Sequence, residues 1–261
     1  MAEKKQLSPK LDVVFHMLFG EPKNESITKK LLEDVLDEKI IKIELDKNPY
    51  LWGNQADDKL GIIDVKAEID DKNMVDIEIQ RSGKKDFVER ILLYWAKMYE
   101  KQIQKTEKYS ELKRCIVISF VDFELDVSKD LPADTKWQIK EAKMGKRILT
   151  EKLEIVILEL PKAEKSIDNK QITKWLKFLE DPYGEEVEKM SENEKEIKEA
   201  VKSLEEINAD EAKVRIAELR EKYILDRNSE LEEAKENGIK QRQRRCCKEN
   251  ERQRNEHRRY N

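Results

Sequence analysis

In "IIDVKAEIDDKNMVDIEIQ" (62–80), apolar and polar side chains alternate along both halves of the segment. Side chains of a β-strand point alternately to opposite faces, so a period of two predicts strands with one apolar and one polar face. The alternation breaks between residues 70 and 75. We therefore predict an antiparallel hairpin closed by a three-residue loop, 71–73, in which Asn73 takes the left-handed conformation.

The polar face of this hairpin is acidic. Its even positions carry the carboxylates of Asp64, Glu68, Asp76 and Glu78. With a 71–73 loop, Asp64 faces Gln80, Lys66 faces Glu78, and Asp64 and Glu78 become diagonal neighbours about 7 Å apart. Two carboxylates at that spacing can bridge a divalent cation whose oxygen ligands lie at about 2.1 Å. The alternative is a solvated face stabilised by a Lys66–Glu78 pair, and the pattern alone leaves both readings open.

The flanking sequence alternates helical and strand-like patterns as far as residue 182. Apolar residues recur at three- and four-residue spacing in 11–19, 24–36, 86–104 and 168–179, which predicts helices. Runs rich in β-branched and apolar residues predict strands at 40–45, 115–123, 135–141 and 153–160. This order predicts an α/β domain, 1–182, with a mixed β-sheet core flanked by helices.

The breakers "DPYG" (181–184) predict the end of that domain, and 183–240 reads as a charged helical C-terminal extension. Its sparse apolar residues predict one or two thin helices that pack on the domain or on a second copy of the chain, which would make a homo-oligomer. A solvated extension without a function of its own explains the pattern equally well.

The composition excludes several classes of protein. No stretch approaches the roughly 18 consecutive apolar residues that a membrane span needs, so no membrane partner is expected. The start, "MAEKKQLSPK", lacks the apolar segment of a secretory signal. Cys115, Cys246 and Cys247 form neither a disulfide framework nor a zinc-ligand spacing. We expect a cytoplasmic protein with reduced cysteines.

The net charge of −4 hides an asymmetry between the body and the end of the chain. From Lys240 onward nine basic residues meet three acids, which leaves 44 basic and 54 acidic residues, a charge of −10, before it. The basic tail, 241–261, suggests either a nucleic-acid arm or a frameshifted segment. A hypothetical codon assignment from Arg242, read from its second nucleotide, gives "GKGDVAKKMKGKGMNIEDI". We hypothesise a frameshift there, and expect a disordered tail that carries no functional inference.

Five pieces of the chain resemble, in order and spacing, the Rpn family of recombination-promoting nucleases and transposases, within the PD-(D/E)XK nuclease superfamily. They are "LSPKLDVVFHMLFG", "DDKLGIIDVKAEID", "MVDIEIQ", "RILLYWAKMYEKQI" and "YSELKRCIVISFVDFEL". The resemblance covers about 8–179, and "EEAKENGIKQ" is similar to the family's helical tail. It implies a restriction-endonuclease-like fold that cuts DNA in recombination or in the movement of mobile elements.

The resemblance also implies roles for the hairpin residues. Asp64 and Glu78 correspond to ligands of Mg²⁺, for which Mn²⁺ can substitute, and the carbonyl of Ile79 completes the shell. Gln80 stands where the superfamily usually has a lysine that positions the attacking water. Because Gln80 carries no charge, activation of water would rest more on the metal, and Lys66 is one candidate for the missing charge.

Three residues outside the hairpin resemble further family positions. Asp12 corresponds to an acid near the N-terminus, although a carboxylate at a helix start is favourable in any case. Arg90 and Tyr94 lie one helical turn apart and match an Arg and a Tyr of the family, which suggests phosphate binding. A surface arginine and a half-buried tyrosine explain them nearly as well.

Two hypotheses follow for function. The first is a Mg²⁺-dependent DNA endonuclease that hydrolyses phosphodiester bonds, with Asp64, Glu78 and Gln80 as catalytic residues. The second is a nuclease fold without catalytic activity that binds DNA or protein partners, which Gln80 in the lysine position keeps open.

Overall fold

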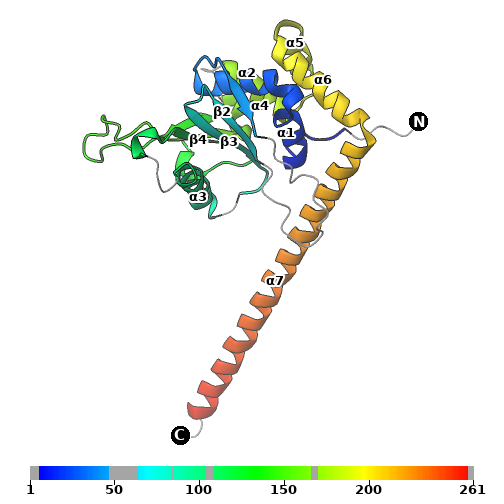
Figure 1. Ribbon diagram of the computed structural model, residues 1–261. Coiled ribbons are helices and arrows are strands. Elements are labelled where there is room, and N and C mark those ends of the chain that lie inside the picture. The colour runs from blue at the N-terminus through cyan, green and yellow to red at the C-terminus, as the bar shows by residue number, and fades with distance from the viewer. Residues whose placement is uncertain (1–5, 47–63, 84, 104–107, 166–169, 258–261) are drawn as a thin grey trace. The chain divides into compact units, whose positions relative to one another are not determined.

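The computed structural model describes residues 6–46, 64–83, 85–103, 108–165 and 170–257, and within the last range the side chains only as far as 243. Six strands form one mixed sheet in the order β1-β2-β3-β4-β6-β5 (Figure 1). They are β1 (Ile43–Leu45), β2 (Val65–Ile69), β3 (Asn73–Gln80), β4 (Arg114–Val121), β5 (Asp134–Trp137) and β6 (Leu153–Glu159). The neighbours β3, β4 and β6 run parallel, and the other pairs run antiparallel. The predicted α/β fold with a mixed sheet is confirmed.

Helices cover both faces of the sheet, which makes three layers. On one face lie α1 (Asp12–Phe19), α2 (Glu25–Leu36) and α4 (Lys170–Glu180). The ring of Phe15 on α1 lies 5.7 Å from that of Phe120 on β4, and Phe19 lies 6.1 Å from Trp175 on α4. On the other face lies α3 (Phe87–Glu100), which buries Phe87 and Ile91 against β4 and β6 (Figure 1). Burial on both faces explains why β4 is a nearly continuous apolar run.

The hairpin register differs from the predicted one by two residues. Val65 pairs with Ile77 and Lys66 with Asp76, so the loop is 70–72 rather than 71–73. Asp70 and Asp71, not Asn73, take the left-handed conformation, with φ of 53° and 55°. The predicted Lys66–Glu78 pairing is therefore wrong.

The side chain of Asp70 explains why the turn forms there. Its Oδ1 accepts hydrogen bonds from the backbone N–H groups of Ile41 at 2.9 Å and Lys42 at 2.7 Å. Aspartate tolerates the left-handed region, and these two bonds tie the turn to the start of β1. The two-residue difference in register does not move any side chain to the other face of the sheet, because side chains alternate with a period of two.

The C-terminal part contains three helices, α5 (Glu185–Asn193), α6 (Lys195–Ala209) and α7 (Glu211–His257), where one or two were predicted. The chain divides by contacts into a unit of residues 1–214 and a unit of residues 215–261. Within the first unit α6 packs on α1 and α2 and fully buries Ile197, Ala200, Leu204 and Ile207. By packing, α5 and α6 therefore belong to the same unit as the sheet. The predicted end of the nuclease domain at residue 182 stays a prediction.

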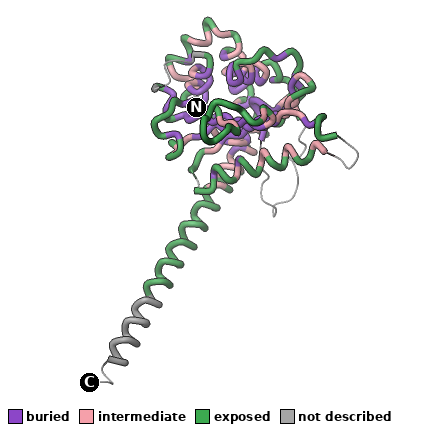
Figure 2. Tube along the Cα trace, turned by 90° about the vertical axis from the view of Figure 1, so that its left-hand side faces the viewer, coloured by how far each residue is buried: buried purple, intermediate pink, exposed green. Residues whose placement is uncertain are grey.

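The second unit consists of the remainder of α7, and its residues are mostly exposed as far as 243 (Figure 2). The helix continues to His257, so the described part of the 241–261 tail is helical rather than disordered as predicted. Glu, Lys, Arg and Gln favour helix and no proline interrupts them, which explains the difference. The frameshift hypothesis stays a prediction. None of the described helices combines the length and the apolar character needed to cross a bilayer.

Candidate active site

The carboxylates of β3 lie on the sheet face that α3 covers. Asp76 pairs with Val117 of β4, and Val117 pairs with Ile155 of β6. Paired residues point to the same face of a sheet, and Val117 and Ile155 pack against Phe87 and Ile91 of α3. The sheet face that α3 covers thus carries apolar side chains on β4 and β6 and acidic side chains on β3.

Three carboxyl groups are buried together at this place. Asp64 is 8% exposed, and Asp76 and Glu78 are each 5% exposed. The observed register, continued by one residue beyond Val65, puts Asp64 directly opposite Glu78 rather than diagonal to it. Directly opposite residues of an antiparallel pair have Cβ atoms about 4.5–5.5 Å apart, which is closer than the predicted spacing.

Burial and mutual repulsion raise the pKa values of this acidic cluster. Burial, with the neighbouring charges of Asp76 and Glu78, raises the pKa of Asp64 to about 8. Burial also raises the pKa of Asp76 to about 7, opposed by Lys66 and reinforced by Glu78. The pKa of Glu78 is raised by burial and is held down by a hydrogen bond from Ser119. Such a group of carboxyls favours a neutralising ligand.

The hydrogen bonds of the cluster are incomplete within the described residues. Ser119 Oγ donates to Glu78 Oε1 at 2.8 Å. Asp76 Oδ1 is buried and has no hydrogen-bond partner among the described residues. Leaving a buried acceptor unsatisfied costs about 1–3 kcal/mol, so this oxygen is a place where a ligand is expected.

Arg90 brings a positive charge to the cluster. Its Nη2 donates to Gln80 Oε1 at 2.6 Å, and Gln80 Nε2 donates to the carbonyl of Ser82 at 3.2 Å. The guanidinium also lies 5.9 Å from the ring centre of Tyr94. Its charge favours the ionised forms of Asp64 and Glu78. Gln80 and the cation of Arg90 thus lie side by side next to the acidic cluster.

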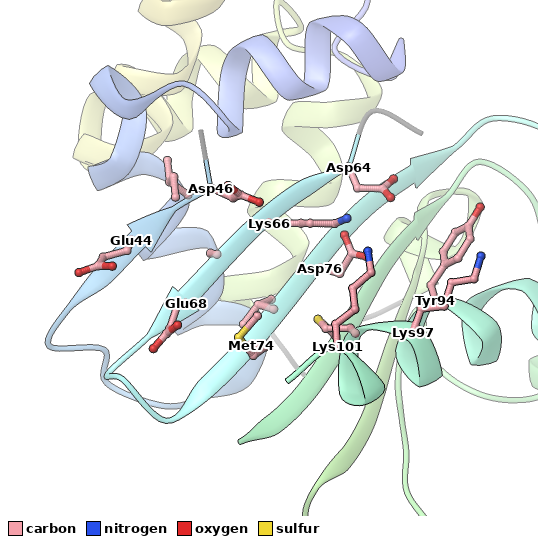
Figure 3. Close-up of a pocket in the computed structure, with 14 residues that line it drawn as sticks. Glu44, Asp46, Asp64, Lys66, Glu68, Met74, Asp76, Tyr94, Lys97 and Lys101 are labelled. Carbon is pink, nitrogen blue, oxygen red and sulfur yellow. The ribbon is translucent and has the colours of Figure 1, made fainter. Parts of the chain in front are cut away.

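A cavity of about 760 Å³ opens beside the cluster, between β1, β2, β3 and α3 (Figure 3). Asp64, Lys66 and Asp76 line it from the side of the sheet. Tyr94 and Lys97 of α3 and Lys101, directly after that helix, line it from the other side. Burial raises the pKa of Tyr94 to about 12, so this phenol stays protonated and can donate a hydrogen bond. The cavity has room for a substrate group next to the acids.

The other predicted residues lie as follows. Asp12 begins α1, which packs beside β3, and its Oδ1 accepts a hydrogen bond from the N–H of Val13 at 2.8 Å. The side chain of Ile79 is buried on the opposite face of the sheet from Glu78, so only its carbonyl is a candidate ligand. Lys66 is exposed and faces Asp76. The roles of Asp12, Ile79 and Lys66 stay predictions.

Two polar groups of the cluster had no predicted role. Asp76 shares the polar face of β3 with Glu78 two residues later, and the alternation already marks it. Ser119 is the only polar residue in the strand "RCIVISFV" after its first arginine and cysteine, which is the signal that singles it out. What the pattern does not show is that Asp76 is buried near Asp64 and that Ser119 donates a hydrogen bond to Glu78.

The site fits a hard divalent cation by its chemistry. All candidate donors are oxygens, as Mg²⁺ and Mn²⁺ prefer, and one carboxylate oxygen among them has no hydrogen-bond partner in the described part of the chain. In the described part of the chain, no three His, Cys, Asp or Glu side chains converge closely enough to hold a metal ion as they stand. The carboxylates would therefore turn toward the ion when it binds.

The chain is thus an α/β protein in which a buried carboxylate cluster lies on β3 and just before β2, both interior strands of a helix-covered sheet. The model of a family described as "PD-(D/E)XK nuclease family transposase" matches residues 9–234, and the chain belongs to this family. Comparison with curated proteins and with solved structures finds no match. The predicted family is confirmed, and the match extends through α5 and α6 into α7.

Proposed function

We propose that this protein is a divalent-metal-dependent DNA endonuclease that hydrolyses phosphodiester bonds during transposition or recombination. The observation that carries the proposal is the buried cluster of Asp64, Asp76 and Glu78 in a chain of a nuclease family. One oxygen of Asp76 has no hydrogen-bond partner among the residues that the structure describes. The cytoplasmic location expected from the composition stays a prediction. Association through the C-terminal helices stays a prediction.

The acids would hold the metal. Asp64 and Glu78 face each other when the register of the hairpin is continued by one residue, and Asp76 adds an oxygen without a hydrogen-bond partner among the described residues. The carbonyl of Ile79 is the remaining candidate. Bound Mg²⁺ or Mn²⁺ would lower the pKa of a water molecule and offset the charge that develops on the phosphate. Ser119 holds Glu78 by a hydrogen bond to one oxygen, which leaves its other oxygen for the ion.

Gln80 and Arg90 would orient the reactants. In hydrolysis, the oxygen of water bonds to phosphorus and one P–O bond breaks, with the proton ending on the leaving alcohol. The Gln80 amide is held at both ends and keeps one N–H free to position a water or phosphate oxygen. Arg90 lies beside Gln80 and would hold the phosphate. Its guanidinium would supply the positive charge that Gln80 cannot supply.

A plasmid-nicking assay tests this function. We expect nicking with Mg²⁺ or Mn²⁺, none with EDTA, and a loss of more than about 100-fold in Asp64→Asn, because one anchor of the ion is removed. Asp130→Asn makes the same change at an exposed aspartate and should keep full activity. Nicking that persists both in EDTA and in Asp64→Asn would refute the proposal.

The second candidate function, DNA binding without cutting, is favoured by one observation. Residue 80, which the resemblance assigns to the usual lysine position, is a glutamine and cannot supply charge itself. If wild type and Asp64→Asn bind DNA equally and neither nicks it with any divalent metal, the binding function replaces the endonuclease.

A further inference from the structure

The chain between β5 and β6 forms a basic projection, which we define as the finger, residues 139–149 ("IKEAKMGKRIL"). Every residue of the finger is exposed. Figure 1 shows this green segment extending beyond the sheet. The proposed catalytic chemistry does not use it, and its composition is unlike that of the acidic body.

Hydrogen bonds give the finger a defined shape. The N–H of Glu141 donates to the carbonyl of Arg147 at 2.9 Å, and the N–H of Leu149 donates to the carbonyl of Ile139 at 3.0 Å. At the tip, the carboxylate of Glu141 accepts from the N–H groups of Lys143 at 2.8 Å and Met144 at 2.6 Å. A segment ordered before binding loses less entropy when it docks.

The surface of the finger combines cations with exposed apolar groups. The finger contains four basic residues and a single acid, Glu141. The carboxylate of Glu141 already accepts two backbone hydrogen bonds at the tip. The basic residues are Lys140, Lys143, Lys146 and Arg147. Among the described residues, none of these four cations forms an ion pair within 4.0 Å, whereas Lys136 just before the finger pairs with Glu154. Met144 and Leu149 are 75% and 77% exposed. A chain with a net charge of −4 thus gathers unpaired positive charge here.

The finger starts close to the row of the sheet that contains Asp76, one of the three acids of the candidate site. Glu78 lies two residues further along β3, in the row of Ser119, Ile157 and Thr135. Trp137 pairs with Ile155, Ile155 with Val117, and Val117 with Asp76. Asp76 and the last residue of β5 therefore share one row, three strand spacings or about 14 Å apart. This separation is comparable to the major-groove width of B-DNA, about 12 Å.

We propose that the finger docks in a groove of duplex DNA next to the site of cutting. Lys140, Lys143, Lys146 and Arg147 contact phosphates, and the apolar side chain of Met144 lies against the base edges. Charge complementarity selects a polyanion, and apolar side chains flanked by cations are a recurring device for holding bent or widened grooves. The proposal rests on the proposed DNA substrate and adds the surface that holds it.

Equilibrium binding measures the finger separately from cutting. In full-length Asp64→Asn with EDTA, fluorescence anisotropy of a labelled duplex is followed across a salt series. Neutralising the finger with K140Q, K143Q, K146Q and R147Q should weaken binding at least tenfold and reduce the salt slope by about 3 to 4, because four phosphate contacts are lost. Met144→Ala should weaken binding a few-fold without changing the slope.

A matched control keeps the same change of charge elsewhere. Substituting K189Q, K195Q, K198Q and K202Q removes four exposed lysines from α5 and α6 and should leave both affinity and slope near those of the parent. Equal losses in both quadruple variants, or no loss in the finger variant, would overturn the proposal.

A second measurement uses the unaltered chain and does not depend on the folding of variants. Acetylation footprinting with duplex DNA should protect Lys143 and Lys146 several-fold and leave Lys195 unchanged. Protection by anionic phospholipid vesicles but not by DNA would overturn the assignment. If DNA binding depends on the finger but no metal-dependent cutting occurs, the endonuclease proposal is refuted and the docking proposal stands. If the protein cuts DNA but binding does not depend on the finger, the docking proposal is refuted and the endonuclease proposal stands.

Discussion

Asp76→Asn should stabilise the metal-free protein at high pH. Asp76 is 5% exposed, and its pKa is raised from an ordinary 3.8 to about 7. The folded state therefore holds a proton that the unfolded state releases between about pH 4 and pH 7. Because the folded state binds more protons in this window, the stability of the metal-free wild type falls as pH rises through it. Asparagine has nearly the same shape and cannot ionise, so it removes that loss.

The size of the effect follows from the same pKa. A rise from 3.8 to about 7 corresponds to about 4 kcal/mol once the carboxylate is ionised. Asp64 lies beside Asp76 and shares the proton uptake, so we expect roughly half, about 2 kcal/mol. For a chain of this size that is about 4–8 °C in Tm at pH 8, with almost no change at pH 4.

The assay is thermal unfolding followed by circular dichroism in EDTA at pH 4 and pH 8. Asp130→Asn should show no shift at either pH, because Asp130 is exposed. Added Mg²⁺ should then stabilise the wild type more than Asp76→Asn, since a ligand that binds only the folded state raises its stability. A Tm that falls in Asp76→Asn at pH 8, or rises equally at both pH values, would refute the reasoning.

Three further outcomes concern the neighbours of the cluster. Ser119→Ala removes the hydrogen bond that holds down the pKa of Glu78. The Mg²⁺ concentration for half-maximal nicking should therefore rise about tenfold at pH 6 and less at pH 8. The same concentration in wild type and variant at pH 6 would contradict this role of Ser119. Arg90→Lys keeps the charge but loses the planar donor to Gln80, and nicking should fall about tenfold while duplex binding in EDTA stays within about twofold; full activity would exclude a positioning role. Burial raises the pKa of Tyr94 to about 12, so the phenol stays protonated from about pH 6 to 10. Tyr94→Phe should therefore change the nicking rate by the same fold at every pH in this range. A pH–rate profile of the variant that is displaced from that of the wild type would show that the phenol titrates.

The sequence by itself determined the kind of each element and the face of each side chain. Periods of two and 3.6 are local properties of the backbone, so the hairpin, the apolar β4 and the helices could be predicted to within a few residues. The same alternation placed Asp64, Asp76 and Glu78 on one polar face. A register error of two residues left that assignment intact, because it preserves the face.

Tertiary structure decided how those side chains meet. The turn formed at Asp70 because its carboxylate caps the start of β1, a contact 28 residues away in sequence, and this set which acids oppose each other. The packing of α3 over the sheet buried the polar face that alternation alone would leave in water, and so raised the pKa values of Asp64 and Asp76. The burial of these acids and the pairing of one acid with another depend on elements that are distant in the chain. No local pattern in the sequence contains this information.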